Sequence, residues 1–444
     1  MSEHDCPSER HSAHAEPQQA GYGFNTRQIH AGERVNPAAG ERIAPIALTA
    51  GYRFDSFADA RDRFAGEADG LVYSRSRNPS TAFAERRIAN LEGGVEAITV
   101  SSGQAAITAA LLTVVQAGER FVSTASIYSG TRTLFGRTFA RFGIGVDYVW
   151  DPTDDAAWDA AIGPDTRAIY TETIPNPLCD LVDIEHLARV AERHRLPLIV
   201  DNTIGTPYLI RPAELGAHVV VHSATKFLSG HGAAVSGVIV DAGTFDWAGA
   251  AHEYPLITRG PRPGAPSLLD RFPATAYARA AREQVVNDIG PALSPLNAFL
   301  LHQGVETLSL RMDRHVANAR AIAEWLSGHP AIDGVAYAGL PDSPHYGLAQ
   351  RRYPGGPGSV FAATVRGGAA GAARFLDGLR LISHMTGIGD VRSMALHPGT
   401  TTHLGFSEEL RLRLGITPGL IRLSIGTEDA ADLIADLDRA LSAC

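Results

Sequence analysis

Seven short apolar runs lie between residues 97 and 241 of this 444-residue chain, and they constrain its fold more than any other feature. Several are near-continuous runs of Val and Ile. Strands that are buried on both faces have this composition, as in a parallel sheet covered by helices. Helical patterns such as 184–194 (IEHLARVAERH) lie between them. The alternation predicts an α/β sheet, with strands expected at 97–102, 120–125, 146–150, 167–173, 197–202, 218–224 and 236–241.

The chain before this region divides into two parts. Residues 1–22 are rich in His, Ser, Glu, Pro and Gln, so we expect a disordered tail. Nothing in such a tail would hold its histidines (His4, His11 and His14) as ligands, and no metal is expected. Residues 23–62 mix Gly, Pro and short apolar stretches, which predicts an extended N-terminal arm.

The chain after the arm divides into a large and a small domain. We expect the large domain at 63–293, including a helix at 84–94 that two glycines stop. The pattern at 294–330 predicts a long linker helix, which Gly304 interrupts and which bridges two lobes. The changed texture beyond it predicts a smaller α+β domain, so that linker and small domain together span 294–444.

Composition excludes several classes of protein. With 39 Lys and Arg against 48 Asp and Glu, the net charge of −9 argues against a broadly basic nucleic-acid binder. No apolar run of about 18 residues predicts a membrane helix, and the polar N-terminus has no secretory apolar core. Three cysteines cannot make a disulfide scaffold. We therefore expect a cytoplasmic enzyme with neither nucleic-acid nor membrane partners.

Common nucleotide and hydrolase motifs are missing from the sequence. It has no G-x-x-x-x-G-K-[ST] loop, no H-E-x-x-H helix and no G-x-S-x-G elbow. No complete G-x-G-x-x-G follows a strand. NAD, ATP and serine-hydrolase chemistry are therefore disfavoured.

The most informative residues stand at the ends of two predicted strands. Asp201 ends one buried strand, and Lys226 follows a later one with Ser223 and Thr225 beside it. Carboxyl ends of parallel strands share one edge of a sheet, where ligands bind. Pyridoxal phosphate (PLP) needs a lysine for its Schiff base and an acid that keeps its pyridine nitrogen protonated. It also needs hydroxyl and N–H donors for its phosphate.

Two further elements support a PLP site. The stretch 101–106 (SSGQAA) predicts a turn from a strand into a helix, where Gly103 permits a close approach of the backbone to a phosphate. Tyr128 follows the strand expected at 120–125, and an aromatic ring at a strand end can stack on the pyridine ring.

These residues belong to motifs that resemble the PLP-dependent enzymes of Cys/Met metabolism, a group that includes cystathionine γ-synthases and lyases and methionine γ-lyases. The resemblance runs from about residue 24 to about residue 441. Its motifs are YSRSRNPS, LEGGVEAITVSSGQAA, TETIPNP, VDNTIGTPYLIRP, VHSATKFLSGHG and IRLSIGTE. Within the group, the stretches 292–319, 339–361 and 389–403 are most similar to O-acetylhomoserine sulfhydrylases.

The resemblance implies the PLP-dependent transferase fold type I and a role for each matching residue. Lys226 would carry the Schiff base and move protons, Asp201 would pair with the ring nitrogen, and Tyr128 would stack on the ring and help the leaving group depart. The residues implied to bind the cofactor are Ser102, Gly103, Gln104, Tyr128, Asp201, Thr203, Ser223, Thr225 and Lys226.

The resemblance also implies substrate and subunit contacts. Asn176, Ser393 and Arg422 would hold the substrate, with Arg422 on its α-carboxylate. Tyr73 and Arg75 would reach the phosphate site of a neighbouring subunit, in a homotetramer built from dimers that share active sites. From their surroundings, we expect His222 to be a packed, satisfied histidine and Cys179 to be a small buried residue rather than a nucleophile.

The sequence departs from the pattern of the family in three stretches. Ala47 and Ala50 replace a Tyr and a Thr in PIALTAGY, and the region 259–277 has no Tyr-His pair. Arg77 replaces a small or apolar residue, which adds a positive charge close to the phosphate site. The first two regions lie near the acceptor side in the family, so they leave the leaving group and the nucleophile open.

The implied reaction is γ-replacement on an O-acyl-L-homoserine by sulfide or a thiol, which gives homocysteine or a related thioether. Three alternatives remain open at this point. One is a γ- or β-lyase that releases a keto acid and ammonia. Another is γ-substitution by an unusual nucleophile in a specialised pathway. The third is a PLP-binding protein without turnover, against which the set of Lys226, Asp201, Tyr128 and Arg422 argues.

Overall fold

A computed structural model describes residues 21–33 and 40–442 of the chain. Residues 1–20 of the predicted tail, with its three histidines, lie outside this part. Within the two described ranges, no helix is long and apolar enough to cross a membrane. The same ranges hold no group of three or more His, Cys, Asp or Glu side chains placed to bind a metal ion.

All seven predicted strands form one sheet, in the order β1-β7-β6-β5-β4-β2-β3. Only β7 runs antiparallel to its neighbours, so the sheet is mostly parallel as expected. The strands are β1 (Glu96–Val100), β2 (Arg120–Thr124), β3 (Gly145–Val149), β4 (Thr166–Glu172), β5 (Leu198–Asp201), β6 (Val219–His222) and β7 (Gly237–Asp241).

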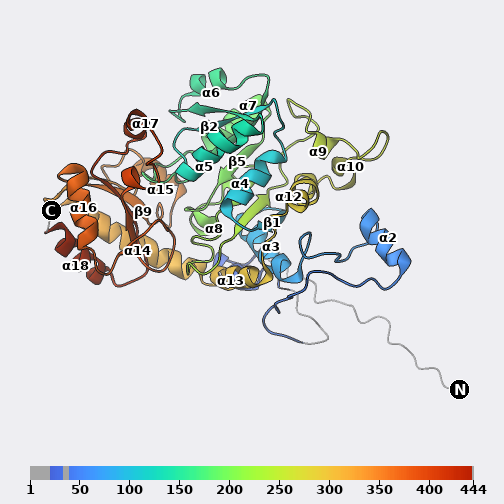
Figure 1. Cartoon of the computed structure of the whole chain (residues 1–444), viewed down its shortest axis with the longest axis horizontal. Helices are drawn as coiled ribbons and strands as arrows, with labels where there is room; N and C mark the ends of the chain where they lie inside the picture. Colours follow the sequence, from blue (N-terminus) through green and yellow to red (C-terminus); the bar gives the residue numbers. More distant parts are fainter. Residues whose placement is uncertain (1–20, 34–39, 443–444) are drawn as a thin grey trace.

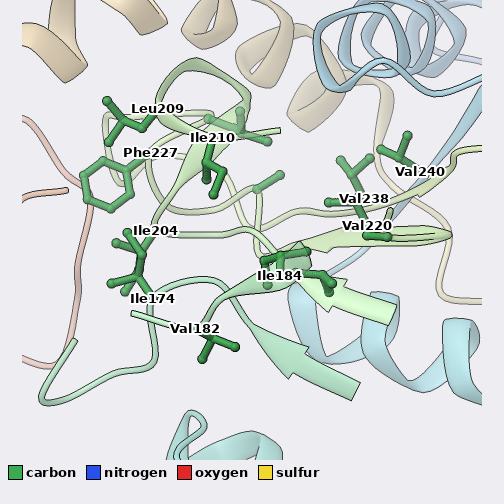
Figure 2. Close-up of a cluster of buried hydrophobic side chains, with 14 of the residues drawn as sticks. Ile174, Val182, Ile184, Ile204, Leu209, Ile210, Val220, Phe227, Val238 and Val240 are labelled. Carbon is green, nitrogen blue, oxygen red and sulfur yellow. The ribbon is translucent and has the colours of Figure 1, made fainter. Parts of the chain in front are cut away.

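The central strands are buried on both faces, as the Val and Ile runs predict. On β6, Val220 belongs to one apolar core, while Val219 and Val221 belong to another on the opposite face. Figure 2 shows the first core, where Val220 and Val238 lie with Phe227 in one cluster of apolar side chains. Because successive strand residues point to opposite faces, helices must cover both sides of the sheet.

Helices surround this sheet in Figure 1, and two of them match predicted helices closely. The helix predicted at 184–194 is α7, and the one predicted at 84–94 is the longer α3. The helices of this region are α3 (Pro79–Glu92), α4 (Gly103–Leu112), α5 (Ser129–Thr133), η2 (Leu134–Phe139), α6 (Asp155–Ala161), α7 (Ile184–His194), α8 (Thr206–Leu209), η3 (Pro212–Leu215), α9 (Pro255–Thr258), α10 (Leu268–Arg271), α11 (Ala276–Ala280), η4 (Ala281–Val286) and α12 (Asn287–Ile289).

The predicted linker helix is two helices, α13 (Pro295–Val305) and α14 (Leu308–Ser327), which break just after Gly304. Figure 1 shows them in yellow and orange, passing from the seven-stranded sheet to the C-terminal part. A Cβ at Gly304 would lie 2.3 Å from the Ser229 carbonyl oxygen, so only glycine lets α13 pack this closely. Arg311 on α14 donates to the Phe227 carbonyl at 2.7 Å. Together they hold the loop that follows Lys226.

A second, five-stranded sheet forms the C-terminal part, in the order β10-β11-β12-β9-β8. Its own apolar core includes Phe361, Leu423 and Leu437, which fits the predicted α+β texture. Its elements are β8 (Ile332–Ala336), α15 (Tyr346–Arg352), β9 (Val360–Val365), α16 (Gly368–Gly378), β10 (Ser383–His384), β11 (Met394–Leu396), η5 (Pro398–Thr400), α17 (Glu408–Arg413), β12 (Leu420–Ser424) and α18 (Ala430–Leu441).

The predicted extended arm contains two short helices, α1 (Phe24–His30) and α2 (Phe57–Ala65). The second crosses the boundary expected at residue 62. Its Phe57 and Phe64 side chains are exposed, at 88% and 75%. The proposed domain boundaries at 22, 62 and 293 remain predictions.

Candidate active site

Strands β1, β2, β4, β5 and β6 run in one direction, so their carboxyl ends meet at one edge of the sheet. A cavity of about 320 Å³ opens there. It gathers residues that are far apart in sequence, and Arg422 reaches it from the second sheet. The predicted residues that line it are Ser102, Gly103, Gln104, Tyr128, Asn176, Asp201, Thr203, Ser223, Thr225, Lys226 and Arg422.

The turn into α4 lies directly against the loop that precedes Lys226. Ser102 caps the helix, since its hydroxyl accepts the Ala105 N–H at 3.1 Å. A Cβ at Gly103 would lie 2.5 Å from the Cβ of Ser223, so glycine is required for this contact. The turn therefore brings the N–H donors of a helix start to the cavity.

Asp201 ends β5, and its side chain is almost fully buried. Burial raises the pKa of the Asp201 carboxyl, whereas hydrogen bonds from Thr203 oppose the rise. The Thr203 N–H donates to Asp201 at 2.8 Å, and the Thr203 hydroxyl accepts the Ser223 N–H at 2.8 Å. Thr203 thus joins the acid to the loop that carries Lys226.

Glu172 is a buried carboxyl of this cavity to which the sequence prediction gave no role. It ends β4 and stands opposite Asp201 in the strand register. Burial, and then the charge of Asp201, raise the pKa of Glu172 well above its ordinary value. Its Oε1 accepts the Tyr128 N–H at 2.7 Å. Two adjacent buried carboxyls cannot both ionise cheaply, so we assign the proton to Glu172. The sequence held one signal that could have identified Glu172, which is its place at a predicted strand end in the motif TETIPNP.

Lys226 and Arg422 are the two cationic side chains of the cavity. Burial, and then the nearby Arg422, lower the pKa of the Lys226 amine. Arg422 lies on β12, between β9 and β11, and is 2% exposed. Burial lowers the pKa of Arg422 to about 10, so it keeps its charge at neutral pH. Its Nη2 donates to the carbonyls of Thr386 at 3.1 Å and Gly387 at 2.8 Å.

Two residues that are predicted to bind the cofactor also make contacts within the protein. The Thr225 hydroxyl donates to the Ser236 carbonyl at 3.1 Å and accepts the Ser236 N–H at 3.0 Å. Tyr128 stands at the start of α5, and its side chain is partly exposed. A Cβ at Gly130 would lie 2.4 Å from the Tyr128 ring, so the ring rests on the backbone of α5.

Three predicted residues and Arg77 do not line this cavity. Tyr73 and Arg75 are exposed, and Arg75 donates to the Asn287 side chain at 3.0 Å. Ser393 donates its hydroxyl to Glu428 at 2.9 Å. Arg77 lines a separate cavity, so within this chain it does not add charge to the phosphate site as expected.

The two side chains predicted to be packed are buried. His222 Nε2 lies 2.6 Å from a Glu92 carboxylate oxygen with both side chains inaccessible, although His222 Nδ1 has no partner among the described residues. Cys179 is buried, and burial raises the pKa of its thiol well above the ordinary value, which does not suit a nucleophile.

The cavity fits PLP by the chemistry of its unused groups. Gln104 Oε1, Asn176 Oδ1 and Arg422 Nε are buried and have no hydrogen-bond partner within the described residues. Buried polar atoms normally have partners. A ligand with a phosphate, an aldehyde and a ring nitrogen would meet a helix start, an amine and a carboxyl in one cavity.

Comparison with known proteins also indicates a PLP-dependent enzyme. The sequence profile of the family described as Cys/Met metabolism PLP-dependent enzyme matches residues 25–442. An O-acetyl-L-homoserine sulfhydrylase from Corynebacterium glutamicum is 43% identical over 95% of this chain and 97% of its own length. An L-methionine gamma-lyase from Pseudomonas deceptionensis is 41% identical over 95% of this chain and 98% of its own.

Among solved structures, one assigned as an O-acetylhomoserine (thiol)-lyase from Campylobacter jejuni superposes with a TM-score of 0.91 at 32% identity. The match covers 95% of this chain and all of that one, and that structure carries a pyridoxyl-lysine phosphate. The chain therefore belongs to the PLP-dependent enzymes of Cys/Met metabolism. It is a PLP-dependent enzyme, and an amino acid is its substrate class.

Proposed function

We propose that this enzyme catalyses γ-replacement on an O-acyl-L-homoserine, in which sulfide or a thiol displaces the acyl group. The observation that carries the cofactor chemistry of this proposal is that Lys226, which shares the cavity with Arg422, is the only lysine among the 444 residues. The relative from Corynebacterium glutamicum, named an O-acetyl-L-homoserine sulfhydrylase, supports this reaction.

In this proposal, both ends of the cofactor are held by residues of the cavity. Ser102, Gly103 and Gln104 bind its phosphate at the start of α4, together with Ser223 and Thr225. Asp201, positioned by Thr203, faces the ring nitrogen, where its negative charge keeps that nitrogen protonated. Tyr128 lies against the ring. Protonated Glu172 fixes the Tyr128 backbone through its hydrogen bond.

Lys226 is the base in this proposal. When bound, PLP draws electrons from the Cα of the amino acid and makes its proton acidic. Lys226 then takes that proton, because a buried amine with a lowered pKa is more readily present in the neutral form. Apolar side chains such as Ile174, Ile204 and Ile388 line the same cavity and help to exclude water.

The substrate is held from the C-terminal sheet. Arg422 has one unused Nε donor and a fixed guanidinium, which suits the α-carboxylate. Asn176 lines the same cavity with a buried side chain. Ser393 bonds to Glu428 and stands just before β11, the strand that pairs with the strand of Arg422. The γ-carbon loses its bond to the acyl oxygen and gains a bond to sulfur.

The proposal includes an assembly and a location. Tyr73 and Arg75 are exposed and outside the cavity of their own chain, which supports a role in a neighbouring subunit. We therefore propose a homotetramer of dimers that share active sites. The scarcity of cysteine supports a cytoplasmic location.

A lyase is the second candidate, because the Pseudomonas relative is named an L-methionine gamma-lyase. The altered region around Ala47 and Ala50 also keeps an unusual nucleophile as an alternative. Neither alanine lines the described cavity.

The single lysine makes the test sharp. Borohydride reduction of the holoenzyme should fix one pyridoxyl group per chain, found on Lys226 by peptide mass spectrometry. The reduced protein provides the inactive control. Untreated enzyme with O-acetyl-L-homoserine and sulfide should form homocysteine, with little keto acid when sulfide is omitted. Keto acid and ammonia at equal rates with and without sulfide would establish the lyase instead, and a thiol panel would reveal another nucleophile.

A further inference from the structure

A second cavity, of about 550 Å³, lies at the other end of β1. Glu96 and Ala97, which begin β1, form one wall, and Arg77 stands just before α3. Arg279 and Arg282 reach it from α11 and η4. Strand β1 separates this cavity from the catalytic turn by about 13 Å, at the usual rise per residue.

Arg282 and Arg279 already have partners, but each keeps an unused donor. Arg282 is buried and donates to Glu85 at 3.1 Å and to the Ala97 carbonyl at 2.8 Å. Arg279 donates to Glu283 at 3.3 Å and lies over the Phe272 ring. The Nε atoms of both arginines are buried without a hydrogen-bond partner in the described ranges.

Arg77 differs from both, because its side chain forms no hydrogen bond or ion pair within residues 21–33 and 40–442. Burial lowers the pKa of Arg77, and the charges of Arg279 and Arg282 lower it further, while Glu96 and Glu283 act in the opposite direction. A partly buried guanidinium that faces two others is costly unless an anion compensates its charge.

We propose that this cavity binds a phosphate-class oxyanion, with Arg77 as its principal ligand and Arg279 and Arg282 as supporting charges. A tetrahedral oxyanion offers several acceptors, and guanidinium groups match them with directed N–H bonds. Glu85 and Glu96 pair with Arg282, and neither forms an ion pair with Arg77 within the described ranges. The inference does not depend on which reaction the enzyme catalyses.

The bound anion would also fix the segment that carries Tyr73 and Arg75. Ser76 donates to the Asn287 side chain at 2.7 Å, as Arg75 does at 3.0 Å. The segment is therefore tied to α12, the element that continues η4. An anion between Arg77 and Arg282 adds a second tie between the same elements.

The test is calorimetric titration of the PLP-loaded holoenzyme, whose cofactor already occupies the catalytic phosphate position. Inorganic phosphate and glycerol phosphate are titrated separately, against chloride at equal ionic strength. We expect saturable binding of at least one, about tenfold or more weaker in Arg77→Ala, as for a lost hydrogen bond to a charged group. Arg77→Lys should be intermediate. Arg374→Ala, an exposed arginine on α16, should bind as the wild type does.

Phosphate could instead bind at Arg422, so Arg422→Ala is titrated in parallel. Binding retained in that variant and lost in Arg77→Ala supports the proposal, whereas the reverse overturns it. Thermal unfolding gives a second readout, since phosphate should raise the Tm of the wild type but not that of Arg77→Ala. Equal binding by wild type and Arg77→Ala would overturn the proposal. Dissociation of the oligomer in Arg77→Ala without any phosphate effect would also overturn it, because a subunit contact would then pair the arginine.

Discussion

The two ends of strand β1 border two polar cavities that differ in how their charges are matched. In the catalytic cavity, cationic Lys226 and Arg422 occur with the carboxyls of Asp201 and Glu172. In the second cavity, Arg282 takes up both carboxylates that line the wall, and Arg77 is left without a partner in the described chain.

The comparison shows that, within the described residues, the two cavities lack different kinds of partner, since the first lacks hydrogen-bond partners for single atoms and the second lacks an ion for a guanidinium. The catalytic cavity holds the Asp201 carboxylate and the protonated Glu172 beside its two cations, and its unused buried atoms are single hydrogen-bonding positions that suit PLP and a substrate. In the second cavity, the Arg77 guanidinium has no carboxylate partner within the described ranges. Burying an unpaired charge costs far more than leaving one neutral acceptor unused. We therefore expect the second cavity to bind an anion.

The largest effect is expected at Lys226. The Lys226→Ala variant leaves no lysine in the chain, so in the proposed mechanism the cofactor loses its covalent attachment and the reaction loses its base. We expect the absorbance of the lysine-bound cofactor, at about 420 nm, to disappear. Turnover should fall by at least about 10³-fold. Retention of both would show that the catalytic cavity has been assigned to the wrong place.

A smaller loss is expected from Asp201→Asn. The variant removes the negative charge that we propose to face the ring nitrogen, but it keeps the shape of the side chain and its position beside Thr203. We expect turnover to fall about 10²-fold or more, with cofactor content, measured after alkaline release, close to that of the wild type. An unchanged turnover number would mean that protonation of the ring nitrogen does not depend on Asp201.

Arg422→Lys probes the geometry of the charge rather than its presence. Lysine keeps the positive charge but cannot offer the directed fork of a guanidinium. We expect the KM for the amino acid to rise by about 10- to 100-fold, with a smaller change in kcat. Arg374→Lys on α16 is the matched control. Equal KM values for wild type and Arg422→Lys would place the carboxylate elsewhere.

The smallest effect concerns stability at the end of β1 that borders the second cavity. Asp241 pairs with Glu96 in the strand register, and burial, with a further contribution from Glu96, raises the pKa of Asp241 to about 6. The folded state therefore holds this proton more tightly than the unfolded state, and the stability gained from it is lost as pH rises from about 4 through 6.

Asp241→Asn removes this titration. Relative to the wild type, the variant should gain up to about 3 kcal/mol of unfolding free energy between pH 4 and pH 7. Urea unfolding across that range measures the difference. A difference that does not change with pH would contradict the burial of an ionisable group there.

The fold could be predicted from the sequence because its signals are local. Runs such as 218–224 in the Val-rich region gave strands, and 184–194 gave α7 with the same bounds. Most of the predicted site residues line one cavity because each stands at the end of such a strand or in a specific motif, and their roles stay predictions. Composition held one more signal. Lys226 is the only lysine of the chain, so it is the only side chain able to form a Schiff base with PLP.

Other features were not predictable, because they depend on elements that are distant in sequence. Glu172 is an ordinary acid in sequence, and only the pairing of β4 with β5 sets it beside Asp201 and raises its pKa. Arg77 is separated by some two hundred residues from Arg279 and Arg282, so no local pattern places their three charges together.

The sequence by itself determined the order of strands and helices and the family, and it proposed the residues that hold PLP, because hydrophobic periodicity and short motifs act over a few neighbours. Tertiary structure decided which of those residues share the catalytic cavity and which arginines share the second one. Burial, proximity and pairing set the cost of a charge, and these arise only when the chain has folded.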